Sequence, residues 1–78
     1  MDGYRLLIKL SAAKEFESLP RDDRRRIAAR IEMLAEDTRP HGCEKLSGED
    51  KYRLRQGDYR IIYQVDDDAG AVTIFKIG

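Results

Sequence analysis

The strongest constraint on the fold is a pair of strand-like segments separated by two turn residues. Residues 51–56 (KYRLRQ) and 59–65 (YRIIYQV) are rich in the residue types that strands favour, and they flank Gly57-Asp58. A two-residue loop with glycine first is typical of a type II′ β-hairpin, and such a loop fixes which residues face each other. The sequence therefore predicts a hairpin whose two strands pair symmetrically about this loop.

The predicted register separates the hairpin into an apolar face and a basic face, because successive side chains of a strand point to opposite sides. The apolar face carries Tyr52, Leu54, Ile61 and Tyr63. The basic face carries Arg53, Arg55 and Arg60, together with Ile62 and Gln64. Two of the arginines, Arg55 and Arg60, are directly opposite each other, an arrangement that destabilises a sheet. Stability therefore does not explain the basic face.

Three guanidinium groups on one sheet face can be interpreted in two ways. Arginine presents a rigid fork of N–H donors that suits phosphate, which favours an anion site with RNA or DNA phosphate as the ligand. The other interpretation is a solvated face whose charge is neutralised by Asp58, by Glu49 or by carboxylates of a partner. A register shifted by one residue would move one strand's arginines to the other face and remove the cluster.

The remaining segments alternate between strand and helix patterns. Residues 4–10 are typical of a strand, and residues 11–19 of a short helix in which Ser11 is the N-cap and which Pro20 ends. The apolar spacing of residues 22–36 is typical of a helix with one face on a core. Residues 71–77 have the composition of a last strand.

The predicted order of elements is β-α-α-β-β-β, within a single domain of residues 1–78. Helices and strands fall in separate runs, which favours the α+β class. We therefore expect one antiparallel sheet with an N-terminal helical hairpin packed on one of its faces.

Charge is balanced over the whole chain but not along it, with 15 Lys and Arg residues against 15 Asp and Glu residues. Residues 1–30 and 51–65 carry a net positive charge, whereas residues 31–50 and 66–78 carry a net negative one. Overall neutrality argues against indiscriminate binding of nucleic acid but permits a local basic site. No apolar run approaches the roughly 18–20 residues that span a bilayer, so we expect a cytoplasmic protein with no membrane contact.

Other candidate sites have weaker patterns. Arg24, Arg25, Arg26 and Arg30 could form a basic helix face, although such runs are usually solvated. His41 and Cys43 are formally a nucleophile pair but lack a third, orienting group, and the run Asp66–Asp68 lacks the spaced ligands of a calcium loop. The single cysteine allows no internal disulfide, and there is no Cys/His cluster for zinc. We expect neither a metal nor a cofactor.

Residues 34–78 resemble the second half of toxins of the RelE/ParE superfamily. The resemblance is carried by the segments Lys45-Leu46-Ser47-Gly48, Tyr52-Arg53-Leu54-Arg55 and Gly57-Asp58-Tyr59-Arg60-Ile61-Ile62-Tyr63. The segment YRLLIKLSAAKEFESLP near the N-terminus also resembles the first strand and helix of that superfamily. The resemblance implies a RelE-like fold and a toxin from a type II toxin–antitoxin pair.

The resemblance implies two different activities within one fold. RelE-like members inhibit translation by cleaving mRNA in the ribosomal A site without a metal, whereas ParE-like members inhibit DNA gyrase. In RelE-like relatives, basic residues at positions matching Arg53, Arg55 and Arg60 contribute to the catalytic site. We expect Arg60 to stabilise the phosphate, and Arg55 and Arg53 to orient it. We also expect Lys45 and Lys51 to contact RNA phosphate.

Two further expectations follow from the resemblance. The chain ends at Gly78, where relatives continue for a short basic tail with an acid/base group, and arginine itself is a poor general base. We therefore expect this chain to cleave RNA weakly or not at all, which also leaves open a relative that only binds its antitoxin. The expected partner is a cognate, RelB-like antitoxin, with mRNA on the ribosome or DNA gyrase as the target.

Overall fold

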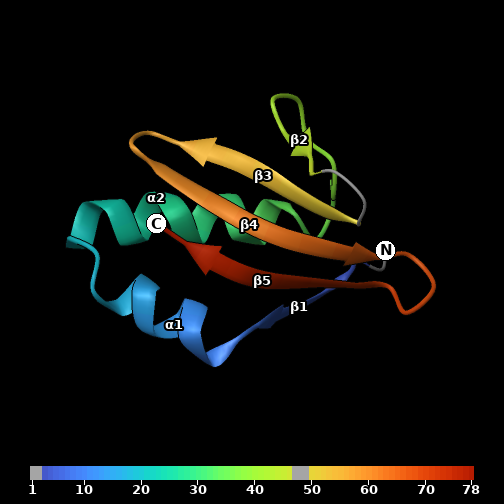
Figure 1. Cartoon of the computed structure of the whole chain (residues 1–78), viewed down its shortest axis with the longest axis horizontal. Coiled ribbons are helices and arrows are strands. Elements are labelled where there is room, and N and C mark those ends of the chain that lie inside the picture. Colours follow the sequence, from blue (N-terminus) through green and yellow to red (C-terminus); the bar gives the residue numbers. More distant parts are fainter. Residues whose placement is uncertain (1–2, 47–49) are drawn as a thin grey trace.

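The computed structural model describes residues 3–46 and 50–78, and within them it has two helices and one five-stranded sheet (Figure 1). The helices are α1 (Leu10–Glu17) and α2 (Arg21–Met33). The strands are β1 (Arg5–Ile8), β2 (Glu44–Lys45), β3 (Lys51–Gln56), β4 (Tyr59–Asp66) and β5 (Ala71–Ile77). The α+β class is confirmed, and the short β2 is a strand that the sequence did not predict.

The β3–β4 hairpin has the register that its loop predicts. Arg55 pairs with Arg60, Arg53 with Ile62 and Leu54 with Ile61. Gly57 has a φ of +61°, and no non-glycine residue of the described chain has a positive φ. This combination fits a type II′ turn, in which the first loop residue alone needs the conformation that glycine adopts without strain. The division into an apolar and a basic face therefore holds.

The sheet has the order β1-β5-β4-β3-β2 and is mixed rather than wholly antiparallel. β1 lies parallel to β5, with Arg5 beside Ala71 and Ile8 beside Ile74, whereas the other neighbouring strands are antiparallel. The expectation of a fully antiparallel sheet was wrong for this pair. A parallel neighbour requires a long crossover, here the two helices and three strands between β1 and β5, and no local pattern specifies it.

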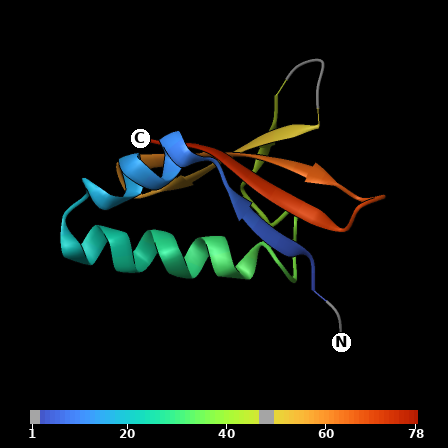
Figure 2. The ribbon, with the colours of Figure 1, turned by 90° about the horizontal axis from the view of Figure 1, so that it is seen from below.

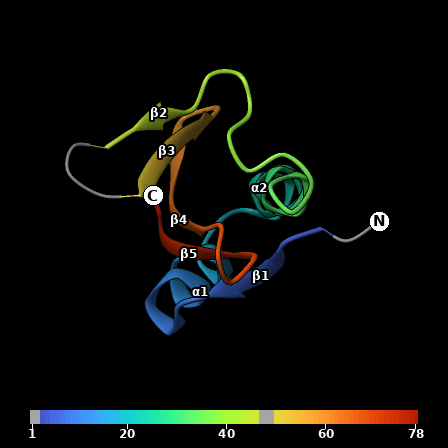
Figure 3. The same cartoon turned by 90° about the vertical axis from the view of Figure 1, so that its right-hand side faces the viewer.

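One face of the sheet is covered by α2 (Figure 3). Ile27, Ile31 and Leu34 at the sheet-facing side of this helix are buried in one cluster with the apolar face of the hairpin. The other fully packed members of the cluster are Ala12, Tyr52, Leu54, Ile61, Tyr63, Val65, Val72, Ile74 and Ile77. The opposite face of the sheet, which carries the arginines of the hairpin, is left to solvent over β3 and β4.

The two helices run in opposite directions, as expected for a helical hairpin (Figure 2). α1 begins at Leu10 after an extended Lys9, so Ser11 is not its N-cap, and Leu10 is exposed rather than part of the strand. Pro20 is the N-cap of α2 and not the end of α1, which stops at Glu17. Neither helix of the described residues has the length and apolar character needed to cross a membrane.

Beyond the end of β1, residues of α1 lie beside the edge of β5. Lys9 donates the last backbone hydrogen bond of this edge to the carbonyl of Ile74, at 3.0 Å. Beyond it, the Glu15 carboxylate accepts a hydrogen bond of 2.9 Å from the backbone N–H of Ile77. A side chain of α1 therefore satisfies an edge N–H that β1 is too short to reach.

Candidate functional site

The basic face of the hairpin is hollowed into a pocket of about 310 Å³. Its lining consists of Gly42, Glu44, Arg53, Arg55 and Arg60. The three arginines come from β3 and β4, whose register is fixed by the Gly57-Asp58 turn, so the sheet itself holds their Cα atoms in place. The structure thus brings together the three residues that the sequence singles out as catalytic candidates.

Glu44 is a residue of the pocket that the sequence did not reveal. β2 pairs with β3 so that Glu44 lies beside Arg53. The Nε of Arg53 donates to Glu44 Oε1 at 3.1 Å, and its Nη2 donates to the same oxygen. The hydrogen bond and charge of Arg53 hold the pKa of the Glu44 carboxyl below its usual value. The pocket therefore contains a carboxylate as well as cations.

The carboxylate beside the arginines is not one that was expected from the sequence. Among the described residues, the carboxylate that pairs with Arg53 is Glu44 and not Asp58. Residues 47–49 lie outside the described part of the chain. The structure therefore does not test the expected role of Glu49 or the Ser47-Gly48 part of the segment that resembles the family. Among the described lining residues, one carboxylate faces three guanidinium groups.

The two lysines expected to contact phosphate lie outside this lining. Lys45 is exposed on β2 opposite Tyr52, whose side chain points into the core, so alternation directs Lys45 away from the arginine face. Lys51 lies on the same face as Arg53, two residues along β3. Its ammonium nitrogen is 4.3 Å from the centre of the Phe75 ring. The structure therefore groups Lys51, but not Lys45, with the arginine face.

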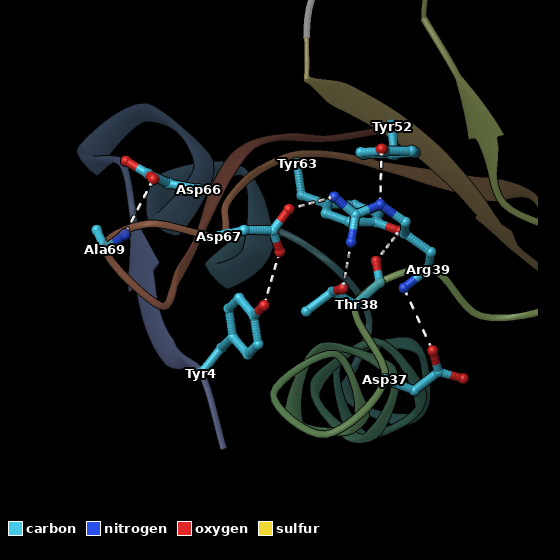
Figure 4. A network of polar contacts seen from close by, with 9 residues as sticks. All are labelled: Tyr4, Asp37, Thr38, Arg39, Tyr52, Tyr63, Asp66, Asp67 and Ala69. Atoms are coloured by element: carbon cyan, nitrogen blue, oxygen red, sulfur yellow. Dashed lines mark hydrogen bonds and ion pairs between the residues drawn. The ribbon is translucent and has the colours of Figure 1, made fainter. Parts of the chain in front are cut away.

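A polar network fixes the segment that leads from α2 to Glu44 (Figure 4). Arg39, in this segment, donates from Nε to the Tyr52 hydroxyl at 2.8 Å and from Nη2 to Asp67 at 2.9 Å. The Tyr4 hydroxyl donates to the other oxygen of Asp67 at 2.6 Å, and the Tyr63 hydroxyl donates to the carbonyl of Thr38 at 2.9 Å. The network joins the residue before β1, strands β3 and β4 and the β4–β5 turn to the segment that precedes β2.

The charges and burial of this network are reflected in its pKa values. Hydrogen bonds from Arg39 and Tyr4 lower the pKa of the Asp67 carboxyl. Burial raises the pKa of the Tyr63 hydroxyl, whose ring stacks on Tyr52 with centroids 5.6 Å apart. The hydroxyl of Tyr63 therefore stays protonated and donates to the carbonyl of Thr38.

Two of the weaker sequence candidates, Arg24 and Arg26, make contacts within or between the helices. Arg24 donates to the Glu17 carbonyl at 3.3 Å, which links the two helices, and Arg26 approaches Asp23 at 3.9 Å. Cys43 is half-buried against the core. The described residues contain no group of three His, Cys, Asp or Glu side chains that could hold a metal ion.

Comparison with known proteins identifies the family of this chain. Residues 6–78 match the family model described as the ParE toxin of the type II toxin-antitoxin system, parDE. The chain belongs to this toxin family, and so to the RelE/ParE superfamily. A comparison with curated proteins gives no match.

Solved structures of RelE proteins are similar over almost the whole chain. The crystal structure of the intact E. coli RelBE toxin-antitoxin complex matches with a TM-score of 0.86 and 25% identity, covering 96% of this chain and 94% of that chain. The archaeal RelE-RelB complex from Pyrococcus horikoshii OT3 matches with a TM-score of 0.84 and 31% identity, covering 96% and 92%. The isolated E. coli RelE toxin matches with a TM-score of 0.84 and 28% identity, covering 96% and 82%.

Proposed function

We propose that this RelE/ParE toxin is an endoribonuclease that cleaves messenger RNA on the ribosome in the cytoplasm. The observation that carries the proposal is the pocket in which Arg53, Arg55 and Arg60 converge beside one carboxylate, Glu44. Likeness to RelE structures supports it at the level of fold and family. Its cognate antitoxin is the proposed protein partner, because two of the similar structures are complexes of RelE with RelB.

The chemistry requires a ribose 2′-oxygen to attack the adjacent phosphorus while the bond from phosphorus to the 5′-oxygen breaks. The products are a 2′,3′-cyclic phosphate and a 5′-hydroxyl, because the leaving 5′-oxygen takes a proton from water as the 2′-hydroxyl gives one up. Negative charge builds on the phosphate oxygens in the transition state, and fixed guanidinium groups stabilise it. Arg60 and Arg55, opposite each other on β4 and β3, are the proposed clamp on these oxygens.

Proton transfer is the demanding part of this reaction for a pocket of arginines, because arginine stays protonated. Glu44 is the titratable carboxylate in the pocket lining, and we assign it the role of accepting the 2′-hydroxyl proton. In the free protein its carboxylate is held by Arg53, which lowers its pKa and makes it a weak base. We therefore propose that cleavage by this chain is slow compared with a toxin whose base has a pKa near neutrality.

The test is cleavage of an mRNA on stalled ribosomes, with the 2′,3′-cyclic phosphate end as readout. Arg60→Ala should lower the cleavage rate by about 100-fold or more, the size expected for loss of a transition-state charge contact. Arg21→Ala, at an exposed arginine at the start of α2, is the matched control and should leave the rate unchanged. Equal rates for Arg60→Ala and the unchanged protein would refute the assignment.

A second candidate function is favoured by the family model, which is that of the ParE toxin. ParE-like members inhibit DNA gyrase and need no nuclease pocket. A supercoiling assay separates the two: gyrase inhibition that survives Arg60→Ala, with no RNA cleavage by the unchanged protein, supports the gyrase target. Binding of the antitoxin without either activity would leave a relative that only binds its antitoxin.

A further inference from the structure

The exposed face of the sheet carries an aromatic side chain that neither the core nor the arginine pocket uses. Phe75 of β5 is half-buried, and it is not part of the buried cluster or of the apolar side chains packed against that cluster. Phe16, the other phenylalanine, does pack against the cluster. A half-buried aromatic ring on the solvent side of a sheet offers a flat apolar surface on which a ligand can stack.

A local irregularity of the sheet places Phe75 on this face. β4 and β5 pair Ile62 with Lys76 and Tyr63 with Ile74, so β5 has one extra residue at this point, Phe75. Such a bulge redirects side chains, and it lets Phe75 and Lys76 both avoid the core while Ile74 and Ile77 remain buried. The bulge therefore adds an aromatic group to the face that β3 and β4 make basic.

Positive charge surrounds the ring. The ammonium nitrogen of Lys9, from the end of β1, is 4.5 Å from the ring centre, and that of Lys51, from β3, is 4.3 Å from it. Both lysines have long, flexible side chains, and a cation–π contact at a partly exposed ring is weak. A nucleobase can therefore take the ring face while the ammonium groups turn to the phosphates on either side.

The ring is also close to the arginine pocket. Ile62 lies opposite Arg53 on one side and beside the bulge on the other, which puts two strand spacings, about 10 Å, between Arg53 and Phe75. A second hollow, lined by Arg60, Ile62, Lys76 and Gly78, adjoins the pocket through Arg60. The arginines of β3 and β4 and the Phe75 ring of β5 thus lie side by side on one face of the sheet.

We propose that Phe75 is a stacking platform for a nucleobase of single-stranded RNA, next to the phosphate held by Arg53, Arg55 and Arg60. The proposal rests on the proposed nuclease function and deepens it by assigning a base-binding position. Stacking on one aromatic ring tolerates any base, because every base has a π-face. The surface would accordingly hold the RNA strand in place without selecting its sequence at this position.

The chain contains no tryptophan, so Phe75→Trp introduces a single fluorescent reporter at the proposed position. A short single-stranded RNA should quench this fluorescence, whereas an abasic strand of equal length and charge should bind without quenching. Phe75→Leu should weaken binding of the base-bearing RNA about tenfold, within the range for one stacked base, and leave the abasic strand unaffected. Phe75→Tyr, which keeps the ring, should bind as the unchanged protein does.

The outcomes separate this inference from the function on which it rests. If Arg60→Ala weakens binding of both strands and Phe75→Leu weakens neither, the stacking platform is refuted and the phosphate site stands. Equal quenching by the abasic strand would likewise refute stacking. If the unchanged protein binds no RNA at all, both proposals fail. Thermal unfolding of each variant verifies that a loss of binding is not a loss of fold, and the abasic strand, which should bind without quenching, separates stacking from a general change in the fluorescence of Phe75→Trp.

Discussion

Arg53 donates two hydrogen bonds to a single carboxylate oxygen of its cross-strand neighbour Glu44. Both side chains are substantially exposed, at 40% and 63%, so the pair contributes little to folding stability. Its chemical effect is to lower the pKa of Glu44, the carboxylate in the pocket lining, and under the proposed function it also occupies a guanidinium that would bind phosphate. In the proposed reaction, substrate phosphate would compete with Glu44 for Arg53, and its arrival would release the carboxylate to accept a proton.

Glu44→Gln should therefore change RNA binding and RNA cleavage in opposite directions. The substitution removes a negative charge and frees Arg53, so RNA should bind a few times more tightly at low salt. It also removes the proposed proton acceptor, and cleavage should fall about 100-fold, at the lower end for loss of a general base. Fluorescence anisotropy with a labelled RNA measures the binding, and formation of the 2′,3′-cyclic phosphate measures the cleavage.

Glu44→Asp is the matched control, because it retains a carboxylate in a shorter side chain and should retain part of the activity. Cleavage by Glu44→Gln at the rate of the unchanged protein would show that Glu44 only neutralises the arginines. Weaker RNA binding by Glu44→Gln than by the unchanged protein would contradict the proposed competition between Glu44 and phosphate for Arg53.

Arg55 and Arg60 face each other across the hairpin, and this like-charge pair should cost the protein stability. Arg55→Thr removes the repulsion and introduces a residue that strands favour. We expect the free energy of unfolding to rise by up to about 1 kcal/mol, measured by urea denaturation. The same variant should lose RNA cleavage, since it removes one half of the proposed clamp.

Arg55→Lys keeps the charge and serves as the control, with no expected gain in stability. The gain of Arg55→Thr should shrink as salt is added, because salt already screens the exposed pair. A variant that is less stable than the unchanged protein at low salt would mean that Arg55 packs or pairs favourably in solution.

The Arg39–Asp67 pair predicts a stability that depends on acid. The pKa of Asp67 lies below its ordinary value of 3.8 in the folded protein, chiefly because Arg39 donates to it. The stabilisation is therefore complete above that ordinary value and is lost as the pH falls through the lower folded value. Asp67→Asn should lower Tm at pH 7, and the difference in Tm from the unchanged protein should shrink below about pH 4.

Differences between the two proteins are the quantity to measure, since Glu15 and Glu44 also have lowered pKa values and titrate in both. Asp68→Asn, at the neighbouring residue of the same turn, is the matched control and should show a much smaller effect. A Tm difference for Asp67→Asn that stays constant from pH 7 to pH 2 would argue against the ionic origin of the stabilisation.

The parts of the fold that the sequence predicts are those set by local rules. The register of β3 and β4 follows from a two-residue loop and strict alternation, so it places Arg53, Arg55 and Arg60 on one face without knowledge of the rest. The core face of α2 follows in the same way from helical spacing, with Ile27, Ile31 and Leu34 all buried.

The parts that the sequence does not predict depend on contacts distant along the chain or on very short elements. β1 pairs with β5 across the two helices and the hairpin that lie between them in the chain, so no local pattern specifies this pair. β2 has two residues, too few to show a period, so the position of Glu44 beside Arg53 had no signal of its own. The bulge at Phe75 is a mismatch between two strands, which neither strand's sequence reveals alone.

Gly57 connects the geometry of the turn to the arrangement of the arginines, and it supports the last prediction. A Cβ at this position would meet nothing within 4 Å, so the cost of Gly57→Ala comes from the backbone, whose φ is +61°. We expect the free energy of unfolding to fall by about 1–2 kcal/mol. Asp58→Ala, at the neighbouring loop residue without a positive φ, should cost much less. Urea denaturation measures the stability of both variants, and RNA cleavage is measured under conditions in which each remains folded. Together they test whether the turn fixes the register of the arginines. A destabilised Gly57→Ala protein that keeps full activity would show that the strands hold the register without the turn.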